Sequence, residues 1–197
     1  MIYCLAENVK ELKQKIEISE ERFMKFTTKK LCLTAVFLAM NVALSSFGVP
    51  VPGGKIYLND VIICFASLVL DPFSAFAVGG IGAFLGDALF YPTPMFVSLA
   101  THGLQAVAIS LIAGGYKGRL PVLWRAIVGV CVGAVIMVAG YTLGKIFVYS
   151  TFEYAMIKLP FETAQATVGA VGGTVLLFAT PLKKYMYERV GDNENRE

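Results

Sequence analysis

Between residues 31 and 181 the chain consists of six apolar runs joined by short connections, many of them rich in glycine and proline. Hydrophobic residues make up 56% of the chain and charged residues only 16%, with most of the charges near the two ends. A run of this kind satisfies its backbone polar groups in lipid only by forming a helix. The sequence therefore predicts an all-α membrane protein with six transmembrane helices, at about 31–48, 58–70, 73–90, 95–113, 126–149 and 161–180.

The distribution of charge divides the chain into three parts. Residues 1–30 form a charged, weakly amphipathic extension, 31–181 a six-helix transmembrane domain that binds substrate, and 182–197 a charged tail. Ten lysines and arginines lie near the span ends on the side that holds both termini, and three on the other. The positive-inside rule places both termini in the cytosol. The extension is either a solvated cytosolic segment or an arm on the membrane surface or on a partner.

Several classes of function have no support in the sequence. No GxxxxGK[ST] phosphate loop is present, so the chain is not expected to hydrolyse ATP by itself. It has one histidine and four widely spaced cysteines, which argues against a metal centre. No nucleophile motif, cofactor motif or basic aromatic stripe is visible, so we expect neither an enzyme nor a nucleic-acid-binding protein.

Small residues at a spacing of four mark faces for close helix contact. Ala35, Ala39 and Ala43 share one face of the first run, which either docks another protein's helix or packs within this chain. Glycine pairs with the same spacing predict close helix contacts at Gly82 and Gly86, Gly129 and Gly133, and Gly140 and Gly144.

The few polar residues of the apolar runs fall at one depth, the outer third of the membrane. Since charges are costly there, they normally pair or face an aqueous cavity. Local explanations are open: helix capping by Asn59 or Asp60, an Asp87–Lys145 ion pair, one internal hydrogen bond for His102, and a water interface for Glu162. Their agreement in depth favours an outward-facing pocket, with tyrosines as stacking faces. The predicted substrate-binding residues are Asn59, Asp60, Asp87, Tyr91, His102, Gln105, Tyr141, Lys145, Tyr154, Glu162 and Gln165.

Two stretches resemble a known family. Residues 53–60, Asp71 with Pro72, 79–83 and Gly86 with Asp87 closely resemble the N-terminal half of S components, the substrate-binding membrane subunits of energy-coupling factor (ECF) vitamin transporters. Residues 160–165 with Gly169 look like the last helix of that family. The resemblance covers about residues 30–185 and leaves the N-terminal extension out.

The resemblance implies a small water-soluble vitamin bound outside and capped by the loop between the first two spans. It also implies partners: a coupling transmembrane protein, docked on Ala35, Ala39 and Ala43, and two cytosolic ATPase subunits in a bacterial-type plasma membrane. A vitamin B6 form or hydroxymethylpyrimidine is the first choice of substrate, with riboflavin or a queuosine precursor as alternatives. Other classes of function are a stand-alone facilitator or channel, and a membrane enzyme using Asp87 with His102.

Overall fold

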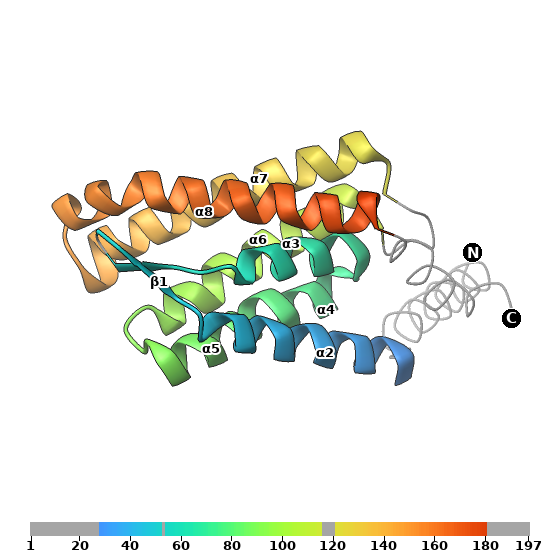
Figure 1. Cartoon of the computed structure of the whole chain (residues 1–197), viewed down its shortest axis with the longest axis horizontal. Coiled ribbons are helices and arrows are strands. Elements are labelled where there is room, and N and C mark those ends of the chain that lie inside the picture. Colours follow the sequence, from blue (N-terminus) through green and yellow to red (C-terminus); the bar gives the residue numbers. More distant parts are fainter. Residues whose placement is uncertain (1–27, 53, 116–120, 181–197) are drawn as a thin grey trace, which may run out of the picture.

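The computed structural model describes residues 28–52, 54–115 and 121–180, and these form a helical bundle with one small hairpin (Figure 1). The extension 1–30 (apart from its last three residues), Gly53, and the tail 182–197 lie outside the described residues. The elements in chain order are α2 (Thr28–Ser45), β1 (Val49–Val51), β2 (Gly54–Ile56), α3 (Asn59–Val69), α4 (Pro72–Phe76), η1 (Ala77–Ile81), α5 (Gly82–Phe90), α6 (Met95–Ala113), α7 (Leu123–Gly144), η2 (Lys145–Tyr149) and α8 (Phe152–Ala179).

Three helical stretches of the described chain are long and apolar enough to cross a membrane. They are Pro72–Phe90, which joins α4, η1 and α5, then Met95–Ala113, and Leu123–Tyr149, which joins α7 and η2. Shorter apolar helices cover Lys30–Ser45 and Asn59–Val69. The predicted helical fold is thus confirmed, whereas six spans and the orientation of the termini stay predictions.

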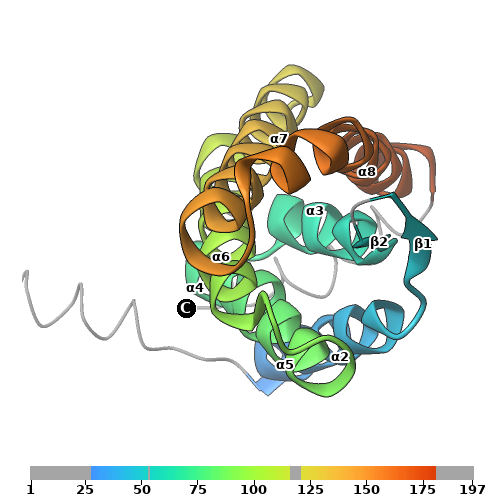
Figure 2. The ribbon, with the colours of Figure 1, turned by 90° about the vertical axis from the view of Figure 1, so that its left-hand side faces the viewer.

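The helix α3 lies in the middle of the bundle, with the other helices around it (Figure 2). Ten of its 11 residues are buried, so its neighbours rather than lipid cover it. At 1.5 Å per residue it is about 17 Å long, well short of a hydrocarbon core of about 30 Å. The short second run therefore ends within protein. Phe65 of α3 meets Phe37 of α2 edge to face, with ring centroids 5.4 Å apart.

The glycine pairs lie at close helix contacts, as the sequence predicted. A Cβ atom on Gly82 would stand 2.6 Å from Asn41 Nδ2, and one on Gly86 2.5 Å from Ser45 Oγ, both on α2. The glycines of α7 face α6 in the same way: Gly133 meets Ile109 at 2.6 Å. The backbones approach closely because these positions carry no side chain.

The turn between α3 and α4 is built around Asp71, the predicted N-cap. Its carboxylate accepts from the Ser74 N–H at 3.3 Å and from Ser74 Oγ at 2.8 Å, and Pro72 follows as the first helical residue. Lys30 Nζ lies 3.0 Å from Asp71 Oδ1. Burial raises the pKa of this carboxyl, but the Lys30 ammonium and the Ser74 donors outweigh burial and hold the pKa below its ordinary value.

Three features differ from the predictions. Helix α8 begins at Phe152 rather than near 161, because Thr151 caps it by accepting from the Tyr154 N–H at 3.4 Å, and Pro160 lies inside the helix. The predicted loop at 150–160 is therefore wrong. The segment 48–57, expected as a loop, contains the antiparallel hairpin β1–β2, in which Val49 pairs with Ile56 and Val51 with Gly54. Helix α7 also begins slightly earlier than predicted, at Leu123.

Candidate functional site

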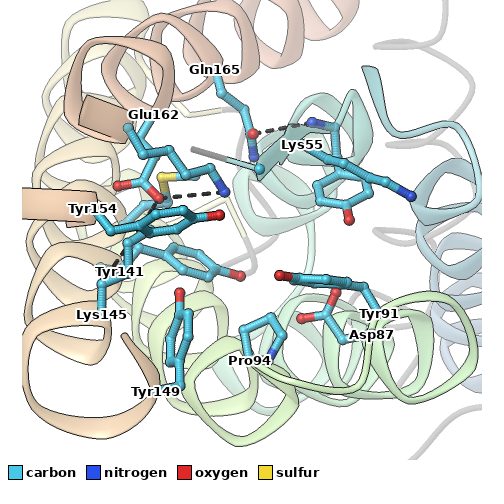
Figure 3. Close-up of a pocket in the computed structure, with 14 residues that line it drawn as sticks. Lys55, Asp87, Tyr91, Pro94, Tyr141, Lys145, Tyr149, Tyr154, Glu162 and Gln165 are labelled. Carbon is cyan, nitrogen blue, oxygen red and sulfur yellow. Dashed lines mark hydrogen bonds and ion pairs between the residues drawn. The ribbon is translucent and has the colours of Figure 1, made fainter. Parts of the chain in front are cut away.

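A cavity opens at the end of the bundle where the hairpin, the α5–α6 turn, η2 and the start of α8 meet (Figure 3). Its empty volume is about 490 Å³, a figure that includes the open solvent at its mouth. It is lined by Gly54, Lys55, Tyr57, Asp87, Tyr91, Pro94, Met137, Tyr141, Lys145, Tyr149, Tyr154, Lys158, Glu162 and Gln165.

The structure brings many of the predicted site residues to this cavity. They are Asp87, Tyr91, Tyr141, Lys145, Tyr154, Glu162 and Gln165. The predicted residues Asn59, Asp60, His102 and Gln105 do not line it and are buried behind it. The sequence reasoning missed Lys55, Tyr57, Tyr149 and Lys158 as wall residues. Lys55, Tyr57 and Lys158 fall in the predicted connections between spans, and Tyr149 is the last residue of the predicted span 126–149, so their common signal is a polar or aromatic residue at or just beyond the end of an apolar run.

Tyrosines form most of the aromatic surface of the cavity. The hydroxyls of Tyr91, Tyr141, Tyr149 and Tyr154 point into the space between the helices (Figure 3). Tyr149 ends η2, a π-helical turn, and such turns redirect side chains at functional sites. Tyr57 lies in the link between β2 and α3, where burial, followed by the charge of Asp87 and the nearby Tyr91, raises its phenol pKa to about 12. It stays a neutral hydroxyl donor at physiological pH.

One wall of the cavity carries two lysines around one glutamate. Lys145 Nζ donates to Glu162 Oε1, and both side chains are almost fully buried, at 1% and 2% exposed. Lys158, one turn before Glu162 on α8, places its ammonium 3.8 Å from the same oxygen. Lys145 Nζ also lies 3.4 Å from the Tyr141 carbonyl. The Asp87–Lys145 ion pair considered from the sequence is therefore wrong, and so is a water-interface position for Glu162.

Asp87 occupies the other wall, from α5. Its Oδ2 accepts from Ser98 Oγ of α6, and Ser98 Oγ lies 2.6 Å from the Tyr141 hydroxyl. Among the described residues no ion-pair partner reaches Asp87. The two walls are thus charged oppositely, with an excess positive charge around Glu162 and a negative charge at Asp87.

A buried polar layer lies directly behind the cavity. Gln165 Nε2 donates to Asp60 Oδ2, while Asp60 Oδ1 lies 3.5 Å from both Gln105 Nε2 and His102 Nδ1. His102 Nδ1 is 2.7 Å from Gln105 Oε1, and its ring meets Tyr141 edge to face at 5.3 Å. These four side chains join α3, α6 and α8 and contact one another, and of the four Gln165 also lines the cavity.

Asn59 does not cap α3, and neither does Asp60, so the capping explanation is wrong. The N-cap position is Leu58, which makes no side-chain cap hydrogen bond. Asn59 Nδ2 instead donates to Asn41 Oδ1 at 3.0 Å, and it lies 3.3 Å from Ser45 Oγ. Its amide therefore ties α3 to α2, next to the close glycine contacts of α5.

The hairpin touches the cavity wall at two points. The Tyr57 N–H donates to Gln165 Oε1 at 3.0 Å, so one glutamine side chain holds both the hairpin link and Asp60. A Cβ on Gly54 would stand 3.3 Å from Lys158 Nζ, and Gly54 has a φ of +131°, which favours glycine. The hairpin therefore sits against the lysine side of the cavity.

Comparison with known proteins identifies the family. The model for the family "ECF-type riboflavin transporter, S component" matches residues 25–184. The chain belongs to this family of S components. It is 27% identical over 137 residues to an uncharacterized protein of Pyrococcus woesei, covering 68% of this chain and 89% of that protein. It is 30% identical over 111 residues to a UPF0397 protein of Exiguobacterium sp., covering 51% of this chain and 61% of that protein.

Membership of the family sets the coarse function. The S component is the substrate-binding subunit of an ECF transporter, a membrane protein and not an enzyme. Within the described part of the chain no group of three or more histidine, cysteine, aspartate or glutamate residues could hold a metal ion.

The alanine stripe of this S component is exposed on α2. Ala35, Ala39 and Ala43 are all exposed, whereas Phe37 and Asn41 on the other side of the helix are buried. Packing of the stripe within the chain is thus wrong. The stripe is a free strip of small residues, and its docking role stays a prediction.

Proposed function

We propose that this S component binds a small water-soluble vitamin, or a vitamin precursor, in the cavity beneath the hairpin. The observation that carries the proposal is the cavity itself, which joins charged groups of both signs to a cluster of tyrosines. Uptake is driven by partner proteins: a coupling transmembrane protein and two cytosolic ATPase subunits, which the family membership supports.

The proposed ligand is a small polar heteroaromatic molecule. Tyrosine faces stack on such rings, and the lysine, aspartate and glutamine side chains supply hydrogen bonds at their edges. A vitamin B6 form or hydroxymethylpyrimidine is the first choice. Riboflavin is the principal alternative, since the matching family is described by that vitamin, and a queuosine precursor is another.

The proposed topology has six spans, an outward-facing cavity and both termini in the cytosol. Support comes from the arrangement of the described helices: α2 begins and α8 ends at one end of the bundle, and the hairpin lies at the other (Figure 1). Exposed large apolar side chains on the outer helices, such as Leu104, Val135 and Val171, fit contact with lipid.

The proposed docking surface for the coupling protein is the exposed stripe of Ala35, Ala39 and Ala43. Small residues repeated every four positions allow two helix backbones to approach closely in lipid. The stripe lies on α2, on the opposite side of that helix from the buried Phe37, so docking there leaves the cavity wall untouched.

The deciding experiment is to purify the chain from its native host and identify the molecule that co-purifies with it by mass spectrometry. We expect one small heteroaromatic vitamin, unchanged in structure, whose addition raises the thermal stability of the ligand-free protein. An empty cavity together with no stabilisation by any vitamin contradicts the proposal.

Reconstitution into liposomes separates transporter subunit from facilitator. We expect ligand uptake only when the coupling protein and ATPases are present with ATP. Flux through liposomes that contain this chain alone would favour a facilitator, and recovery of a chemically altered ligand would favour an enzyme using Asp87 and His102.

A further inference from the structure

We propose that the cavity selects a heteroaromatic zwitterion: a ring that presents an acidic oxygen to Lys158 on one side and a protonated nitrogen to Asp87 on the other. This inference rests on the proposed function and names its ligand by chemical class. It is carried by the two charged walls of the cavity and by the groups on them that the protein leaves without a hydrogen-bond partner.

The positive wall holds one more cation than anion. Glu162 neutralises only one of the two ammonium groups around it, and Lys145 is the nearer of the two. Lys158 lies 3.8 Å from the carboxylate, beyond hydrogen-bond distance, and its side chain is 14% exposed. Its ammonium therefore has donors to offer a ligand. A partly desolvated cation of this kind is stabilised by an anionic oxygen.

The negative wall offers an acceptor. Only Oδ2 of Asp87 is hydrogen-bonded, to Ser98, whose oxygen also lies 2.6 Å from the Tyr141 hydroxyl. The other carboxylate oxygen has no hydrogen-bond partner among the described residues, and Asp87 lines the cavity. Asp87 and Lys158 do not form an ion pair with each other, so each is open to a separate group of one ligand.

Tyrosines and the charges of the two walls together point to the class of ligand. Tyr91, Tyr141 and Tyr149 project their rings and hydroxyls into the space between Asp87 and Lys145 (Figure 3). A neutral ring would bury both charged walls without compensating either, which is costly. An anion would compensate only the lysine wall, and a cation only Asp87. A zwitterion compensates both with one molecule.

The experiment measures binding of pyridoxine, which carries a phenolate and a pyridinium N–H in its zwitterionic form, to the purified full chain. The comparators are riboflavin and hydroxymethylpyrimidine. Two analogues each lack one of the two groups: 3-deoxypyridoxine lacks the phenol oxygen, and 1-deazapyridoxine has C–H in place of the ring nitrogen. Each loss also leaves the remaining group mostly uncharged at neutral pH, so the analogues test the zwitterion and the variants below assign the two walls. Hydrogen bonds to charged groups predict about 10- to 100-fold weaker binding for each analogue.

Two variants identify which wall of the cavity binds which group of the ligand. Asp87→Asn should weaken pyridoxine binding about 10-fold or more, yet leave 1-deazapyridoxine binding unchanged, because that analogue never used the carboxylate. Lys158→Met should likewise weaken pyridoxine binding about 10-fold or more and leave the binding of 3-deoxypyridoxine unchanged, because that analogue has no phenol oxygen to offer the lysine. Thr163→Ala, at an exposed side chain beside Glu162, is the matched control and should bind all ligands as the wild type does.

The outcomes separate the inference from the proposed function. Tighter binding of riboflavin or hydroxymethylpyrimidine than of pyridoxine contradicts the zwitterion inference and leaves the proposed function, binding of a vitamin, standing. Equal affinities for pyridoxine and both analogues also contradict the zwitterion inference, but not the proposed function. If none of the three parent vitamins binds and none co-purifies from the native host, the proposed function and the inference both fall.

Discussion

The buried Lys145–Glu162 pair gives the sharpest test of how this bundle tolerates charge. We predict that Glu162→Gln destabilises the ligand-free protein more than Lys145→Met does, although each removes one half of the same pair. The reason is Lys158. After Lys145→Met, Glu162 keeps a cation 3.8 Å away, whereas after Glu162→Gln two ammonium groups face each other with no carboxylate between them.

The size of the effect follows from burial. Breaking a buried pair by removing one partner costs about 3–5 kcal/mol, and Lys145 is only 1% exposed. We expect Glu162→Gln to reach that range and Lys145→Met to cost roughly half as much. For a chain of about 200 residues, 1 kcal/mol corresponds to roughly 2–4 °C in Tm, so Glu162→Gln should lower Tm by roughly 6–20 °C. The double variant should be more stable than Glu162→Gln, because the ammonium of Lys158 is then the one cation of this cluster left without a carboxylate, and its side chain is partly exposed.

Thermal unfolding of the four proteins in one detergent, without ligand, completes the double-mutant cycle. Folding is checked by circular dichroism at low temperature. The reasoning is refuted if Lys145→Met lowers Tm as much as Glu162→Gln, since Lys158 would then have no compensating role. A double variant as unstable as the sum of the single variants would also refute it, because the pair would not be coupled.

Three further predictions follow from the packing and the turn. Gly82→Ala should cost about 1–3 kcal/mol, because its Cβ would stand 2.6 Å from a side chain of α2. Gly129→Ala, whose Cβ would stand 3.3 Å from the Ile109 carbonyl oxygen, should lower Tm less; equal Tm shifts would contradict the closer contact at Gly82. Ala39→Leu should preserve ligand binding and weaken pull-down of the coupling protein; normal pull-down would remove the stripe as a docking surface. Lys30→Met should lower Tm slightly at pH 7. The difference in Tm should vanish as the pH falls below 3.8, the ordinary pKa of the carboxyl, and through its lower pKa in the folded protein, because protonated Asp71 no longer attracts the ammonium. A difference in Tm that grows in acid would contradict this prediction.

Much of the fold could be predicted because each feature has a local cause. Apolar runs bounded by glycine and proline marked the helices, and Asp71 before Pro72 marked a capped helix start. The glycine pairs marked close helix contacts. The early start of α8 was missed because Glu153 and Lys158 interrupt the apolar residues of 152–160 and Pro160 lies inside the helix.

The candidate site was harder, because depth in the membrane fixes only one of a residue's coordinates. Asp60 and His102 lie near the cavity, yet they are turned into a layer behind it that closes on Gln105 and Gln165. Whether a side chain faces a cavity or a neighbouring helix depends on rotation about the helix axis. That rotation is set by packing across the whole bundle, and no short stretch of sequence encodes it.

The central position of α3 bears on how the bilayer acts on this protein. Because ten of its 11 residues are covered by protein, changes in lipid thickness reach α3 only through the helices around it. Hydrophobic matching is therefore a property of the outer helices, which adapt by tilting. Asp60 and Asn59, at the start of α3, are held by side chains of α2, α6 and α8. The polar layer behind the cavity is thereby insulated from the lipid, and its geometry is expected to be the same in thin and thick membranes.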